Sequence, residues 1–170
     1  MFSIEKCSAP TNTQLDKYAT NGGYADCYRT KTTRQVSFPD FVFAFYTTPL
    51  FRLERYILKM TVAKPSTDVE ARQLADGTSE HFAAWRVEAR SQNEILMCDI
   101  QGRTRSWLMT IPMHRANGVQ TQLYFGSAVV PRPNPKAGQP SLELWLRALL
   151  RFHKIYSILL LYSVKSNIEY

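Results

Sequence analysis

Two arginines and a tryptophan alternate along the stretch DIQGRTRSWLM, at Arg103, Arg105 and Trp107. A strand would place all three side chains on one face. There the guanidinium groups would either line an anion pocket or form the solvent face of a sheet. Asp99 and Gly102 predict a type I turn followed by a left-handed bulge. That turn pairs Asp99 with Arg103 and sets the register of the hairpin.

This register divides the neighbouring strands into a charged face and a drier face. The charged face consists of Arg86, Glu88, Asp99, Arg103 and Arg105. The drier face consists of Trp85, Val87, Ala89, Leu96, Cys98, Thr104, Ser106 and Leu108. Because burying this set of charges would cost far more than exposing it, we expect the arginines on the outer, solvated face. A slip of one residue would reverse the assignment.

His153 and Tyr124 are candidate catalytic residues. His153 shares a face of the predicted C-terminal helix with Leu149 and other apolar residues. An inward histidine beside a cavity could orient a ligand or move a proton near neutral pH. The alternative is a buried histidine satisfied by a backbone carbonyl or a tyrosine hydroxyl. The sequence has no GxSxG, HExxH or glycine-rich phosphate loop, so no motif names a reaction.

The formal net charge of +7 would suit nucleic acid or an anionic membrane. The basic residues are scattered, however, without a block of like charges or a nucleic-acid-binding signature. We therefore expect no specific nucleic-acid binding. The three cysteines form no CxxC or Cys/His cluster, so neither a disulfide framework, a metal site nor a cofactor is predicted. A reduced, cytoplasmic compartment is the simplest interpretation.

A length of 170 residues predicts one domain, 1–170, with 1–20 as a loosely packed lead-in. Local signals then predict the elements. The N-cap signals are Ser37, Thr48, Thr67 (with Glu70 in a capping box) and Ser141. The predicted strands span about 24–34, 81–90, 94–100, 103–111 and 119–130. Leu50, Leu53, Ile57 and Met60 form an apolar stripe on the second helix.

This order of elements resembles the helix-grip fold of START-like lipid-transfer domains, polyketide cyclases and the birch pollen allergen (the SRPBCC superfamily). More closely, it is similar to a bacterial family associated with that superfamily. The resembling segments are VSFPDFVFAFYTTPLFRLER, FAAWRVEARSQNEILMCD and RFHKI. The resemblance implies an α+β fold in which a curved antiparallel sheet wraps around a long C-terminal helix and encloses an apolar cavity.

Three functions fit this interpretation. In the first, the cavity binds a hydrophobic or aromatic small molecule. Its predicted lining is Trp85, Val87, Leu96, Ser106, Leu108, Phe125, Leu149 and His153. In the second, the protein is a cyclase- or dehydratase-type enzyme that uses His153 and a tyrosine such as Tyr124 as acid and base. In the third, the C-terminal segment IYSILLLYS, apolar almost all round, forms a homodimer or touches a membrane surface.

Overall fold

The computed structural model describes residues 4–20, 24–62, 65–115, 118–130 and 140–169, and in the last helix it describes the side chains from Lys154 on. The strands are β1 (Glu5–Cys7), β2 (Tyr24–Thr32), β3 (His81–Phe82), β4 (Trp85–Arg90), β5 (Glu94–Asp99), β6 (Thr104–Arg115) and β7 (Gly118–Val129). The helices are α1 (Asp16–Thr20), α2 (Phe38–Tyr46), α3 (Pro49–Val62), α4 (Asp68–Ala75) and α5 (Pro140–Glu169).

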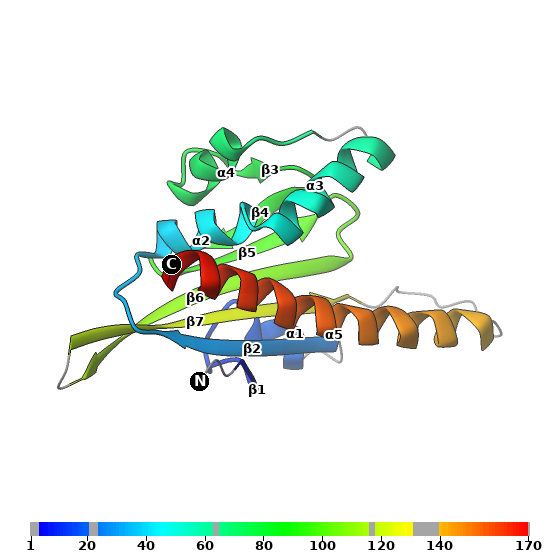
Figure 1. Cartoon of the computed structure of the whole chain (residues 1–170). Helices are drawn as coiled ribbons and strands as arrows, with labels where there is room; N and C mark the ends of the chain where they lie inside the picture. Colours follow the sequence, from blue (N-terminus) through cyan, green and yellow to red (C-terminus); the bar gives the residue numbers. More distant parts are fainter. Residues whose placement is uncertain (1–3, 21–23, 63–64, 116–117, 131–139, 170) are drawn as a thin grey trace.

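The fold is α+β, as predicted, and its centre is a curved sheet in the order β1-β2-β7-β6-β5-β4-β3 (Figure 1). Every neighbouring pair of strands is antiparallel. Helices α2 to α5 lie on one side of the sheet, with α5 running along β2 and β7, and α1 lies on the other side (Figure 1). We call these the helix face and the lead-in face.

Three of the four predicted capping residues start their helices, whereas the fourth, Ser141, lies inside α5, which begins at Pro140. The Ser37 hydroxyl accepts a hydrogen bond from the backbone N–H of Asp40 at the start of α2. The Thr48 hydroxyl accepts one from the N–H of Phe51 at 3.1 Å in α3. Thr67 and Glu70 form the predicted capping box of α4. These contacts satisfy N–H groups that have no partner within a helix, which fixes the point where each helix begins.

Aromatic rings fill the helix face between α2, α3 and the sheet. The ring of Phe45 lies 4.9 Å from that of Phe125 on β7, measured between centroids. The ring of Tyr46 lies 4.8 Å from Phe51 and 5.1 Å from Phe82. All five side chains are buried, so this part of the helix face is a packed aromatic core.

The lead-in face has a core of its own, and Leu15 of the lead-in belongs to it. Leu15 is only 1% exposed, and it packs with the fully buried Trp107. The Leu15 side chain occupies the space where a Cβ on residue 126 would lie, so a glycine is needed there. The Glu94 carboxylate accepts hydrogen bonds from the Trp107 indole at 2.8 Å and from the backbone N–H of Gln14 at 3.1 Å. The lead-in is thus attached to the sheet by the apolar contact of Leu15 with Trp107 and by the hydrogen bond from Gln14 to Glu94.

The predicted turn at Gly102 is confirmed, since its φ is +69° and its N–H donates to the carbonyl of Asp99. The predicted register of β5 is wrong by one residue, because Cys98 pairs with Arg105. The cause is the Asp99 carboxylate, which accepts the N–H groups of Arg103 and Thr104 at 2.7 and 3.1 Å. Thr104 therefore pairs with Val129 of β7 but not with β5, and the pairing of β5 with β6 begins at Cys98 and Arg105.

The shift of one residue places each side chain of β5 on the face opposite to the one predicted. Leu96 packs in the lead-in core, and Ile95 and Met97 pack in the helix-face core. A bulge in β4 between Val87 and Ala89 places these two residues on opposite faces. Val87 packs against the helix-face core, and Ala89 packs against the lead-in core beside Leu96.

Candidate functional site

A row of buried polar side chains crosses the helix face of the sheet. Ser106 of β6 lies opposite Ser127 of β7, which lies opposite Asp26 of β2, and all three residues are buried. The Ser127 hydroxyl donates to one oxygen of Asp26, and the Tyr24 hydroxyl donates to the other at 3.1 Å. Buried positions in a hydrophobic core are usually apolar. This row of polar side chains is therefore a candidate functional site.

The Tyr46 hydroxyl adds a further polar group beside Ser106. Tyr46 is only 1% exposed. Within the described part of the chain, no group forms a hydrogen bond of normal geometry with its hydroxyl. Burial raises the pKa of Tyr46 above its usual value, and the nearby Ser106 hydroxyl lowers it only in part. Tyr46 therefore presents a neutral hydroxyl without a satisfactory partner.

A half-buried carboxyl, that of Glu54, lies on the helix face. The Tyr156 hydroxyl of α5 donates to the carboxylate of Glu54 on α3. Burial raises the pKa of Glu54, and the bond from Tyr156 lowers it only partly. The charge of Glu54 also raises the pKa of Tyr46, which shows that the two groups interact. Glu54 can thus hold a proton at a higher pH than an exposed glutamate.

The structure places most of the predicted cavity lining on the helix face. Trp85, Val87, Leu108 and Phe125 pack in or against the helix-face core, and Ser106 belongs to the polar row. Leu96 does not, because the register of β5 turns it to the lead-in face. The side chains of Leu149 and His153 lie outside the described residues.

Tyr124, the other catalytic candidate, faces away from the helices. Phe125 and Leu123 point to the helix face, so alternation along β7 places Tyr124 on the lead-in face. Its ring lies 6.2 Å from that of Trp107. The predicted use of Tyr124 in a cavity beside the C-terminal helix is therefore wrong.

Arg105 lies on the face away from α5, as predicted, but it is not solvated. Its Nε donates to the Glu88 carboxylate at 2.5 Å and to the Tyr18 hydroxyl at 3.0 Å. The Arg105 side chain is only 10% exposed, because the lead-in covers it. Glu88 fills the place that a bound anion would take, so Arg105 does not form an anion pocket. Arg103 precedes β6 and is half-buried in the turn.

Sequence reasoning missed three of the polar groups on the helix face: Asp26, Ser127 and Glu54. Asp26 and Ser127 stand in strands that alternate too weakly to show which face they take. Glu54 stands next to Leu53 of the predicted apolar stripe of α3. Most of that stripe faces solvent in the structure. Phe51, Glu54 and Arg55 face inward, while Leu53, Ile57 and Met60 are exposed.

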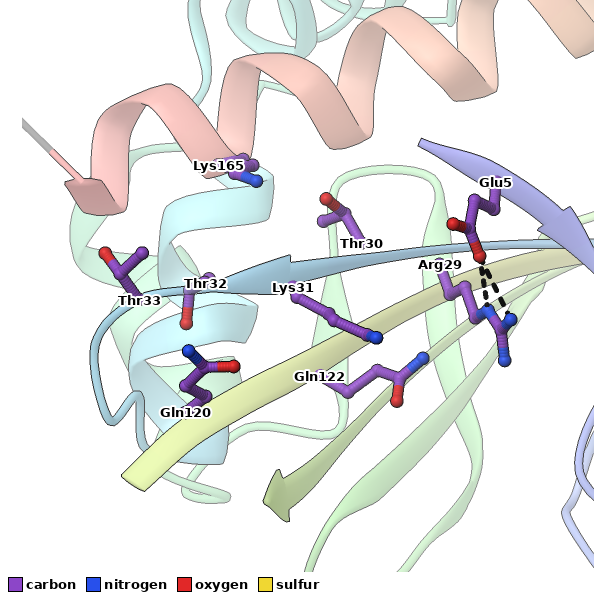
Figure 2. Close-up of a pocket in the computed structure, with 9 residues that line it drawn as sticks. All are labelled: Glu5, Arg29, Thr30, Lys31, Thr32, Thr33, Gln120, Gln122 and Lys165. Carbon is purple, nitrogen blue, oxygen red and sulfur yellow. Dashed lines mark hydrogen bonds and ion pairs between the residues drawn. The ribbon is translucent and has the colours of Figure 1, made fainter. Parts of the chain in front are cut away.

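Two pockets lie away from the polar row. One, of about 220 Å³, lies between the end of β2 and the start of β7, and Figure 2 shows its polar lining. Its charges are largely paired, since Arg29 binds Glu5 at 3.0 Å and Lys165 lies 4.0 Å from Glu169. The other, of about 210 Å³, lies beside Asp68, which both Arg52 and Arg55 bind.

No protein-family model matches this chain, and no curated protein is detectably similar to it. Among the described residues, no group of three or more His, Cys, Asp or Glu side chains is placed to hold a metal ion. In the same part of the chain, no helix has the length and apolar character needed to cross a bilayer.

Proposed function

We propose that the protein binds a hydrophobic or aromatic small molecule with one polar group, between the sheet and α5, in a helix-grip arrangement. The observation that carries this proposal is the buried Tyr46 hydroxyl that has no hydrogen-bond partner of normal geometry in the described residues. A buried polar group left unpaired costs about 1–3 kcal/mol. A ligand that supplies the missing partner would recover that free energy on binding.

The row next to Tyr46 indicates what the polar group of the ligand would be. Ser106 and Ser127 offer hydroxyls, whereas Asp26 and Glu54 bring carboxyl groups to the same region. A carboxylate or phosphate on the ligand would meet these acids in a low-dielectric setting. An uncharged hydroxyl or carbonyl group therefore fits best. The apolar body of the ligand would lie against Leu108 and Phe125, in the next row of the helix face.

The proposal can be tested on the protein as purified. Native mass spectrometry, followed by solvent extraction and identification of what is released, should reveal a small neutral molecule. Tyr46→Phe should lower its occupancy, because only the hydroxyl is lost. Tyr124→Phe is the matched control on the lead-in face and should retain it. The proposal fails if no molecule is released and neutral aromatic compounds do not raise the melting temperature, or if both variants lose the molecule equally.

A second candidate function, self-association, rests on a different observation. Two neighbouring helices expose apolar stripes: Leu53, Tyr56, Ile57 and Met60 on α3, and Ile155, Ile158, Leu159 and Tyr162 on α5. These side chains are between 41% and 68% exposed. Helix α3 turns Glu54 and Arg55 inward and its apolar side chains outward. An exposed apolar surface of this kind is typical of a binding interface.

The occupant that fits this surface best is a second copy of the chain. The named side chains carry no charge, and the neighbouring Arg52 is bound by Asp68 at 2.5 Å. Its pairing with Asp68 makes Arg52 less available to the anionic headgroups of a membrane. Two copies related by a twofold axis would cover the stripes with one another.

Light scattering during size-exclusion chromatography should show a dimer for the natural sequence and a monomer for Leu53→Glu or Ile158→Glu. Val69→Glu on α4, which replaces an equally exposed apolar residue elsewhere, should remain a dimer. A natural chain that is monomeric at high concentration contradicts the proposal. Binding to anionic liposomes by such a monomer would assign the surface to a membrane instead.

A further inference from the structure

Two cysteines distant in the sequence face each other across β1 and β2. Cys7 pairs directly with Cys27, and their Sγ atoms lie 3.4 Å apart. Neither is in a disulfide. Directly opposite residues in an antiparallel ladder have Cα atoms about 4.5–5.5 Å apart, within the range that a disulfide bridges. Side-chain rotation alone could bring the sulfurs to the bonding distance of about 2.05 Å.

The surroundings make the two thiols unequal. Cys7 is half-buried near the edge of the sheet, and Cys27 is buried in the lead-in core. The hydrogen bond with Cys27 and the positive charge of Arg29 lower the pKa of Cys7, whereas the bond with Cys7 and burial raise the pKa of Cys27. Arg29 lies across the ladder from Glu5, two residues from Cys7, and Figure 2 shows the ion pair that holds its guanidinium. Cys7 is therefore the more accessible and more nucleophilic sulfur.

We propose that Cys7 and Cys27 form a redox site that hydrogen peroxide or a small organic hydroperoxide converts to a disulfide. The Cys7 thiolate attacks one peroxide oxygen, the O–O bond breaks, and the leaving oxygen takes a proton to become water or an alcohol. Cys7 is then a sulfenic acid. The Cys27 sulfur attacks it, the S–O bond breaks, and the hydroxyl leaves as water with the Cys27 proton. The two thiols lose two electrons and the peroxide gains them, so the reaction is balanced.

The third cysteine supplies the matched control. Cys98 is fully buried on β5, and its thiol donates to the carbonyl of Asp99 at 3.3 Å. Without a second thiol beside it, Cys98 should stay reduced under mild peroxide. Cys98→Ser should therefore form the same disulfide as the natural sequence.

The test treats the full chain with a small excess of hydrogen peroxide and then removes the oxidant. We expect the number of thiols titrated after unfolding to fall from three to one. We also expect a mass loss of about 2 Da, the mass of two hydrogen atoms. Non-reducing digestion should yield a peptide in which Cys7 is linked to Cys27, and a reductant should restore all three thiols.

The variants make the outcome decisive. Cys27→Ser should gain oxygen at Cys7 instead of losing two hydrogens, because no resolving thiol remains. Cys7→Ser should react more slowly than the natural sequence, because the accessible thiolate is gone. The proposal is overturned if the natural chain accumulates sulfinic acid at Cys7 without a disulfide, if Cys98 takes part in the linkage, or if Cys7→Ser reacts as fast as the natural sequence.

Discussion

Two half-buried glutamates on opposite sides of the sheet have pKa values that are shifted in opposite directions. Glu88, on the lead-in face, would have its pKa raised by burial, but hydrogen bonds from Tyr18 and Lys17 and the charge of Arg105 lower it below the usual value. Glu54, on the helix face, accepts a hydrogen bond from the Tyr156 hydroxyl, which lowers its pKa less than burial raises it. The pKa of a half-buried carboxyl falls where the fold brings cations to it and rises where burial is the larger influence.

The difference arises from what covers each face. The lead-in face is closed by a short polar segment that carries the cation Lys17 and the hydroxyl of Tyr18 to the sheet. The helix face is closed largely by the aromatic side chains of α2 and α3, and among the described residues no cation contributes to the pKa shift of Glu54. The first face is therefore held by paired charges around one tryptophan, and the second by aromatic packing around isolated polar groups.

The largest expected effect tests whether both faces are true cores. Trp107→Ala and Phe45→Ala should each lower the free energy of unfolding by about 3–5 kcal/mol, because each removes a fully buried aromatic side chain. Urea denaturation of both variants measures this. If Trp107→Ala costs less than 1 kcal/mol while Phe45→Ala costs several, the lead-in does not form a core in solution. Ile100→Ala, which truncates an exposed side chain, should change stability little.

The second prediction concerns the charged pair on the lead-in face. Arg105→Met keeps most of the side-chain volume and removes the bond to Glu88, so it should cost about 2 kcal/mol at pH 7. Because the folded pKa of Glu88 is lowered, its contribution is present above the unfolded pKa of about 4.3 and is lost as the pH falls through the folded value. The difference between Arg105→Met and the natural sequence should therefore shrink in acid. A constant difference from pH 7 to pH 3 would show that Glu88 is not the partner that matters.

The smallest expected effect is at Glu54 and has the opposite sign. Because the folded pKa of Glu54 is raised, its contribution to stability is present below about pH 4.3 and is lost as the pH rises through the folded value. Glu54→Gln stays neutral and can still accept from Tyr156. It should match the natural sequence near pH 4 and exceed it by about 1 kcal/mol at pH 7. Unfolding titrations across this range measure it, and a variant that becomes relatively weaker as the pH rises would contradict the assignment.

The parts of the fold that depend on neighbouring residues could be predicted from the sequence. Helix starts follow from caps such as Ser37 and Thr67, and the alternation along β6 correctly separates Arg105 from Ser106. These features need no knowledge of distant segments.

The parts that depend on distant or side-chain contacts could not be predicted. The register of β5 depends on which N–H groups the Asp99 side chain accepts. The orientation of α3 depends on partners from other segments, because Arg55 binds Asp68 and Glu54 binds Tyr156. The polar row was missed for the same reason, since it exists only once β2, β6 and β7 lie side by side.

The short strand β1 has a consequence for handling the protein. It pairs with Cys27 to Arg29 of β2, and Leu15, a few residues later, covers Trp107. Trimming the first twenty residues as a dispensable extension would leave an unpaired strand edge beside an uncovered aromatic surface. Sheet edges of that kind recruit other chains. The trimmed protein should aggregate at concentrations where the full chain stays dispersed, so a protease that nicks the lead-in would produce precipitate rather than a smaller, well-behaved domain.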